Sequence, residues 1–193
     1  MSYYLEVWLR GFAKDFLKSI STKDRESYHP HITLVRPFQL VAAEDEVQQK
    51  IVEFCQGRKP IPFSLEGKGT FEGAVHYVPI TNSAALLHFN DGLEELLTGD
   101  VQFVQKLNDE KILHATVDTD IEIASSPRID QYMLRLTGIK DKLIWFSYDF
   151  VTQAVLTRAE SLEKRRWYET VHRFSAEQGL LPTRQGYQEI GKR

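Results

Sequence analysis

The stretch His31-Ile32-Thr33-Leu34 recurs later in the chain as His114-Ala115-Thr116-Val117, so one His-x-Thr-aliphatic phrase occurs twice. Side chains alternate between the two faces of an extended strand. In each copy the histidine and the threonine would therefore share one face, while the aliphatic residues point into the core behind them. The repetition predicts two equivalent strands that each present an imidazole beside a hydroxyl.

Two imidazoles and two hydroxyls suit metal-free attack on a phosphodiester, which needs a base, an acid and hydrogen-bond donors for the phosphate oxygens. Histidine titrates near neutral pH, so one neutral and one protonated imidazole can coexist. We predict that His31 and His114 are the acid and the base, in an order that the sequence leaves open. Thr33 and Thr116 would donate to the phosphate oxygens. One such phrase often arises by chance, but two copies in apolar, strand-like surroundings favour an enzyme over structural histidines.

The length of 193 residues favours one compact unit over two independent domains. No apolar run is long enough to span a bilayer, and the first ten residues alternate like a strand rather than a signal peptide. We therefore expect a cytoplasmic protein with no membrane partner. The formal net charge of −3 disfavours extensive binding to duplex nucleic acid. The basic triplet Lys164-Arg165-Arg166 is expected to be a solvated turn, with a contact to an RNA backbone as the alternative. Cys55, the only cysteine, is expected to be a buried helical residue and not a nucleophile.

Hydrophobic periodicity predicts alternating strands and helices in the first half of the chain. The second half partly mirrors this plan, as two copies of one unit would. The expected helices cover about 12–20, 43–56, 83–97 and 126–136. The expected strands cover 3–10, 29–35, 61–67, 74–80, 112–117, 142–158 and 167–174, and the segment 177–193 has the composition of a loosely packed tail.

The chain resembles the 2H phosphoesterases, and within them the LigT-like group of RNA 2′,3′-cyclic phosphodiesterases and 2′-5′ RNA ligases. The resemblance rests on Pro30-His31-Ile32-Thr33-Leu34-Val35-Arg36 and on the second phrase at His114. Further along, Gly69-Thr70-Phe71 and the stretch 75–80 resemble the family's Gly-x-Phe turn and its following strand. The stretch 167–171 resembles the family's closing strand, so the likeness covers most of the chain.

The resemblance implies an α+β fold of two pseudo-symmetric lobes, whose antiparallel sheets face a central cleft with helices outside. Residues 1–193 would form this single bilobal domain, with 176–193 as a C-terminal extension. The implied reaction is hydrolysis of a 2′,3′-cyclic phosphate, on a nucleotide or an RNA end, to a 2′-phosphate, and the resemblance also implies 2′-5′ RNA ligase activity. We expect a monomer that needs no cofactor and no metal.

Other residues carry weaker predictions. The resemblance places Arg36 in the cleft as a substrate-binding residue, whereas simple alternation from Thr33 turns it to the opposite face. Phe38 is expected to pack in the core, with stacking on a base as the alternative; Tyr77 and Tyr168 are weaker stacking candidates. Structural or surface positions are expected for the remaining histidines outside the motifs, His76, His88 and His172.

Two other functions stay open at this point. One is a metal-dependent hydrolase that uses His29, His31 and His114 as ligands, which would also need a carboxylate and an open coordination position. The other is an RNA-end-binding module that has the cleft but does not turn over substrate. Each histidine has a threonine beside it, and this arrangement favours catalysis. A binding module would not need two histidines that can carry protons.

Overall fold

The structure is a computed structural model that describes residues 1–21, 30–71, 75–104, 111–126, 128–140, 144–157, 180–183 and 186–189. Its elements follow one another in the order β1 (Ser2–Leu9), α1 (Gly11–Ile20), β2 (His31–Leu40), α2 (Glu44–Cys55), β3 (Ser64–Leu65), β4 (Gly69–Phe71), β5 (Val75–Thr81), α3 (Ala84–Leu96), β6 (Val101–Phe103), β7 (His114–Val117), β8 (Tyr132–Gly138), β9 (Ile144–Asp149), β10 (Ala154–Thr157), β11 (Leu180–Thr183) and β12 (Gly186–Glu189).

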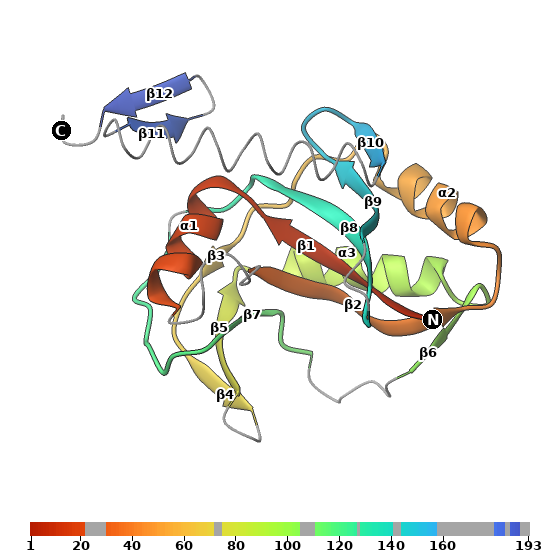
Figure 1. Cartoon of the computed structure of the whole chain (residues 1–193), viewed down its shortest axis with the longest axis horizontal. Helices are drawn as coiled ribbons and strands as arrows, with labels where there is room; N and C mark the ends of the chain where they lie inside the picture. The colour runs from red at the N-terminus through yellow and green to blue at the C-terminus, as the bar shows by residue number, and fades with distance from the viewer. Residues whose placement is uncertain are drawn as a thin grey trace.

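A single large sheet organises these elements (Figure 1). Its strands run in the order β10-β9-β8-β1-β2-β7-β5-β3, with β4 added to β5 and β6 added to β2, while β11 and β12 form a separate pair. The pairs between these strands are antiparallel. An antiparallel sheet with helices packed on it confirms the predicted α+β class. Strand β2 from the first half of the chain is the neighbour of β7 from the second half, so both halves contribute to this one sheet. The predicted central cleft between two lobes is not confirmed.

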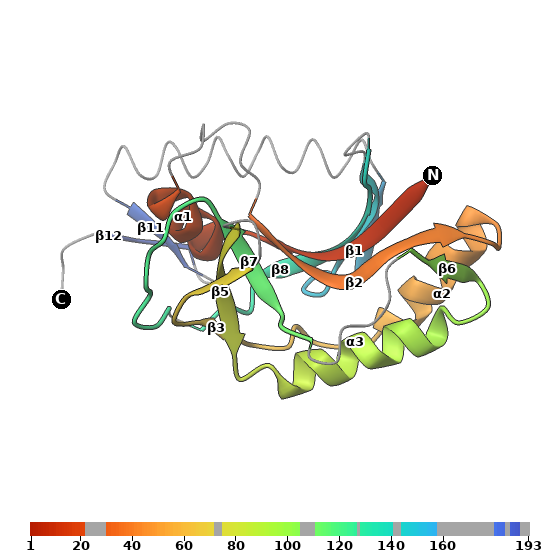
Figure 2. The ribbon, with the colours of Figure 1, turned by 90° about the horizontal axis from the view of Figure 1, so that it is seen from below.

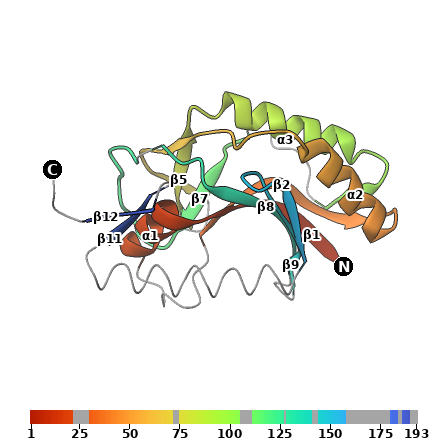
Figure 3. The ribbon, with the colours of Figure 1, turned by 90° about the horizontal axis from the view of Figure 1, so that it is seen from above.

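Helices α2 and α3 lie along the same face of the sheet (Figures 2 and 3). On α3 the buried residues recur at helical spacing, so one stripe of this helix faces the core. Asn90 in that stripe is fully buried, and its Nδ2 donates a hydrogen bond of 2.7 Å to the carbonyl of Leu34. This bond ties α3 to β2 next to the first His-x-Thr phrase, where the register between β1 and β2 shifts.

The three predicted helices before residue 100 and the predicted strands 3–10, 74–80 and 112–117 are confirmed within two residues. Strand β2 continues to Leu40, beyond the predicted 29–35, and only Ser64–Leu65 of the predicted strand 61–67 is a strand. The prediction of one strand over 142–158 is wrong, because the chain turns after Asp149 and forms the two paired strands β9 and β10.

The predicted helix near 126–136 is wrong, because this region contains strand β8. Every residue of β8 is buried, so its apolar residues do not alternate with exposed ones. A short apolar run of this kind cannot be distinguished from a buried helix by periodicity alone.

Several predictions concern residues outside the described ones: His29, Tyr168, His172, the triplet 164–166 and the expected strand 167–174. None of the helices that the structure describes is long and apolar enough to cross a membrane.

Candidate active site

The two His-x-Thr phrases lie side by side on neighbouring strands. Ile32 of β2 is paired with Ala115 of β7, and both side chains are fully buried in the core. Because the strands are antiparallel, the residues that flank this pair are His31 beside Thr116 and Thr33 beside His114. Alternation turns all four away from the buried pair. The structure therefore brings the four predicted residues together on the face of the sheet opposite Ile32 and Ala115.

This face leaves the four side chains accessible to different degrees. The His31 side chain is 34% exposed, and Thr116 is exposed as well. Thr33 and His114 are half-buried. Each motif thus contributes one histidine and one threonine whose side chains are at least partly accessible to solvent.

His114 is held by a neutral acceptor. Its Nδ1 lies 2.8 Å from the carbonyl oxygen of Ile112, a geometry in which Nδ1–H donates and Nε2 keeps its lone pair. Burial is the main cause that lowers the pKa of His114 below 6.5, and the charge of His31 lowers it further, although the bond to Ile112 opposes both. A neutral imidazole with a free Nε2 is suited to accept a proton.

His31 is flanked by a carboxylate and an aromatic ring, both from β1. The Oε2 atom of Glu6 lies 3.9 Å from Nδ1 of His31, and the ring centroid of Tyr4 lies 5.8 Å from that of the imidazole. Burial and the nearby Glu6 carboxylate raise the pKa of the Tyr4 hydroxyl, so this phenol stays protonated. The surroundings of the two histidines therefore differ in charge.

Aromatic rings surround His114. The rings of Phe71 and Tyr77 are stacked at 4.2 Å between centroids, and their centroids lie 4.9 Å and 5.0 Å from that of His114. Gly69 makes this arrangement possible, because a Cβ at this position would lie 2.1 Å from Cζ of Tyr77. Phe71 is 39% exposed, so part of its ring surface is available to a ligand.

Arg36 is not brought to the histidines by its described contacts. Its Nε lies 3.5 Å from a carboxylate oxygen of Glu94 on α3, and its guanidinium carbon lies 4.2 Å from the ring centroid of Phe103 on β6. Its assignment as a substrate-binding residue stays a prediction. Phe38 is fully buried and packs edge-on against Phe103, as core packing predicts.

Other reactive residues of the described chain lie elsewhere. Cys55 is fully buried at the end of α2, and burial raises the pKa of its thiol to about 12, which confirms the predicted core position. The Nδ1 atom of His76 lies 3.2 Å from the hydroxyl oxygen of Thr70. His88 is exposed on α3. In the ranges that the structure describes, no group of three or more His, Cys, Asp or Glu residues could hold a metal ion.

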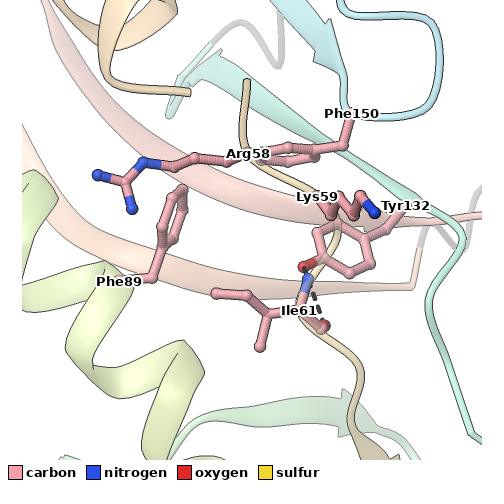
Figure 4. Close-up of a pocket in the computed structure, with 6 residues that line it drawn as sticks. All are labelled: Arg58, Lys59, Ile61, Phe89, Tyr132 and Phe150. Atoms are coloured by element: carbon pink, nitrogen blue, oxygen red, sulfur yellow. Dashed lines mark hydrogen bonds between the residues drawn. The ribbon is translucent and has the colours of Figure 1, made fainter. Parts of the chain in front are cut away.

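A hollow of about 260 Å³ lies apart from the two motifs (Figure 4). Its lining contains neither motif histidine, and consists of Arg58, Lys59, Ile61, Phe89, Tyr132 and Phe150. The Tyr132 hydroxyl and the Arg58 guanidinium in it already have partners within the fold. The Tyr132 hydroxyl accepts a bond from the Ile61 amide and donates one to the Ile61 carbonyl, and Arg58 Nε donates to the carbonyl of Phe54.

Glu6 and Arg135 were not predicted from the sequence. The sequence contains a signal that could have found Glu6: it is the one charged residue in the apolar run Tyr3-Tyr4-Leu5-Glu6-Val7-Trp8. A buried charge requires a partner. Arg135 lies within the predicted helix 126–136, and a helix there does not pair it with Glu6 as strand β8 does.

The fold and the site together define an α+β protein whose sheet presents two His-x-Thr phrases on adjacent strands. A sequence model of the 2′-5′ RNA ligase superfamily matches residues 8–139, a span that includes both phrases. The chain belongs to this superfamily, which confirms the resemblance to the LigT-like 2H phosphoesterases. No curated protein matches the chain.

Proposed function

We propose that the chain is a metal-independent phosphodiesterase that opens a 2′,3′-cyclic phosphate on a nucleotide or an RNA end. The observation that carries this proposal is the pairing of Ile32 with Ala115, which sets both histidines and both threonines on one accessible face. Membership of the 2′-5′ RNA ligase superfamily supports a substrate with a phosphodiester at a ribose.

In the proposed reaction His114 is the base. Its Nε2 takes a proton from water while the water oxygen forms a bond to phosphorus. The bond between phosphorus and the ribose 3′ oxygen breaks, and His31 donates a proton to that oxygen. The products are a 2′-phosphate and a 3′-hydroxyl, and proton exchange with solvent restores both histidines. With a 5′-hydroxyl in place of water, the same attack would open the ring to a 2′-5′ phosphodiester, and the 3′ oxygen would again leave as a hydroxyl.

The threonines would stabilise the charge that moves onto the non-bridging phosphate oxygens. Thr33 and Thr116 each offer one hydroxyl donor beside a histidine of the other strand. Donors that are already in place when this charge develops lower the barrier, because they need no reorganisation.

The rings beside His114 support a substrate that carries a base. Phe71 presents partly exposed ring surface next to the proposed catalytic base, and Tyr77 supports it from behind. Aromatic side chains bind unpaired bases by stacking, with little dependence on base identity. We therefore place the nucleobase of the substrate on Phe71.

The test is a turnover assay on a panel of nucleoside 2′,3′-cyclic phosphates, RNA ends with a cyclic phosphate and 2′-5′-linked dinucleotides. His31→Ala and His114→Ala should each lower kcat by about 10²–10⁴-fold. His88→Ala is the matched control, because His88 is exposed on α3. Binding without turnover by the unmodified protein would favour the RNA-end-binding module, and a folded His31→Ala variant with normal turnover would refute the proposal.

A further inference from the structure

Strand β1 places a carboxylate beside the proposed site, on the same face of the sheet as Thr33. Glu6 is only 2% exposed, although it lies between the core residues Leu5 and Val7. Across the sheet it is paired with Thr33 of β2 on one side and with Arg135 of β8 on the other. One row of the sheet therefore leads from a motif threonine through a buried carboxylate to a buried guanidinium.

The two oxygens of Glu6 have different surroundings. Oε1 accepts a hydrogen bond of 3.1 Å from the Thr137 hydroxyl and lies 3.8 Å from Nε of Arg135. Oε2 is buried without a hydrogen bond in the described part of the chain, and Nδ1 of His31 lies 3.9 Å from it. Thr137 and Arg135 thus hold Oε1, Oε2 faces the imidazole, and the Tyr4 hydroxyl also interacts with the carboxylate.

Stability alone does not account for this cluster. Arg135 is 1% exposed, and its guanidinium carbon lies 4.0 Å from the ring centroid of Trp8. Removing a carboxylate and a guanidinium from water is costly, and apolar residues of similar size often stabilise a fold as well as a buried ion pair does. Glu6 of this buried ion pair also faces His31, a proposed catalytic residue. An effect on His31 therefore explains the pair better than stability does.

The histidines differ in what faces their Nδ1 atoms. His114 faces the neutral carbonyl of Ile112, and His31 faces the carboxylate of Glu6. A carboxylate behind an imidazole selects the tautomer with a proton on Nδ1, fixes the ring orientation and stabilises the positive charge of an imidazolium. Among the residues that the structure describes, the titratable groups that face His31 are Tyr4 and Glu6 of β1 and His114 of β7, and Arg135 acts on it through Glu6.

We propose that Glu6 is a positioning residue that holds Nδ1–H of His31 against its carboxylate, directs Nε2 to the substrate and thereby makes His31 the acid. Arg135 and Thr137 keep Glu6 in place. This inference rests on the proposed function for its catalytic part. During the reaction His31 loses the proton on Nε2 to the ribose oxygen, the proton on Nδ1 stays, and Glu6 neither gains nor loses a proton.

The first test is Glu6→Gln, which keeps the size of the side chain and removes its charge. We expect kcat to fall by ~10–100-fold, as for other residues that orient a catalytic group. KM should change little, because Glu6 is almost fully buried and is proposed to act through His31. Glu53→Gln is the matched control, since Glu53 is exposed on α2 and its change should leave kcat as it is.

The double variant Glu6→Met/Arg135→Met removes the ion pair without leaving either charge buried alone, so it guards against a variant that fails to fold. It should unfold at a temperature no lower than that of the unmodified protein and still lose kcat. A folded double variant with unmodified kcat would overturn the inference, because the cluster would then be only structural.

A spectroscopic measurement separates this inference from the proposed function. Correlations between ring nitrogens and carbon-bound ring protons report the tautomer of a neutral histidine by NMR, and they need no substrate. In alkaline buffer His31 should carry its proton on Nδ1 in the unmodified protein and lose this preference in Glu6→Met/Arg135→Met. An unchanged tautomer would refute the role of Glu6 even in an active enzyme. Failure of the unmodified protein on every substrate would refute only the proposed function.

Discussion

Ile32 and Ala115 are paired across strands β2 and β7, although 82 residues separate them in the chain. Both side chains are fully buried, so this pair is a packed contact of the core. Its consequence lies on the other face of the sheet, where the flanking histidines and threonines come together. A core contact between two apolar residues therefore assembles the polar site.

The hydroxyls of Thr33 and Thr116 should contribute to the rate. Replacement by valine keeps the branched shape of each side chain but removes the donor, and we expect kcat to fall by ~10²–10³-fold for each variant. Replacement by serine keeps the donor and should preserve most of kcat. Steady-state kinetics on the best cyclic-phosphate substrate decide the matter, and a valine variant as active as its serine counterpart would contradict the assignment.

The dependence of activity on pH should reflect the lowered pKa of His114. Burial, followed by the charge of His31, disfavours its protonated form, so His114 stays neutral at pH values at which an ordinary histidine with a pKa of 6.5 is protonated. As the base it must be neutral, and the acidic limb of kcat/KM should therefore have its midpoint below pH 6.5. Circular dichroism over the same range excludes acid unfolding as the cause. A midpoint above pH 6.5 would argue against His114 as the base.

Activity should survive exhaustive chelation. The reason is the chemistry of the available ligands: the chain has one cysteine, which is buried at the end of α2, and the described residues contain no group of three that could hold a metal ion. The measurement is turnover after dialysis against EDTA, with and without added zinc or manganese. Loss of activity that either metal restores would support the metal-dependent hydrolase, with His29 as a ligand.

The stacked rings next to His114 should determine affinity for the base. Stacking of a base on an aromatic side chain is worth about 1–3 kcal/mol, so Phe71→Ala should raise KM by roughly 10–100-fold. Gly69→Ala should also raise KM, because the new Cβ displaces the Tyr77 ring that supports Phe71. Phe12→Ala, which removes another exposed phenylalanine, is the control. Ribose 2′,3′-cyclic phosphate without a base should be hydrolysed equally by all four proteins; a KM that rises for this substrate as well would exclude base stacking as the cause.

Phe38 should affect stability and not substrate binding. Its ring is fully buried between those of Tyr3 and Phe103. Phe38→Ala should lower the free energy of unfolding by about 3–5 kcal/mol, measured by urea denaturation, and leave KM unchanged in the folded protein. An increase in KM with little loss of stability would instead indicate that Phe38 contacts the base.

The strands and helices that the sequence predicts best bury one face and expose the other, so that apolar and polar residues recur with the period of the element. Helix α3 has this property, and its predicted and observed limits differ by one residue at each end. Strand β8 does not, because it is covered on both faces. A fully buried strand lacks the alternation by which strands are recognised.

The sequence by itself determined the chemistry of the candidate site: two histidines and two threonines, each pair on one face of a strand. Period-two alternation is a local property of the backbone, so no tertiary information was needed. Only the tertiary structure decided that β2 and β7 are neighbours, that Arg36 contacts Glu94 and Phe103, and that Glu6 and Arg135 meet beside His31. Strand order and cross-strand register depend on contacts between residues far apart in the chain, and local periodicity contains no information about them.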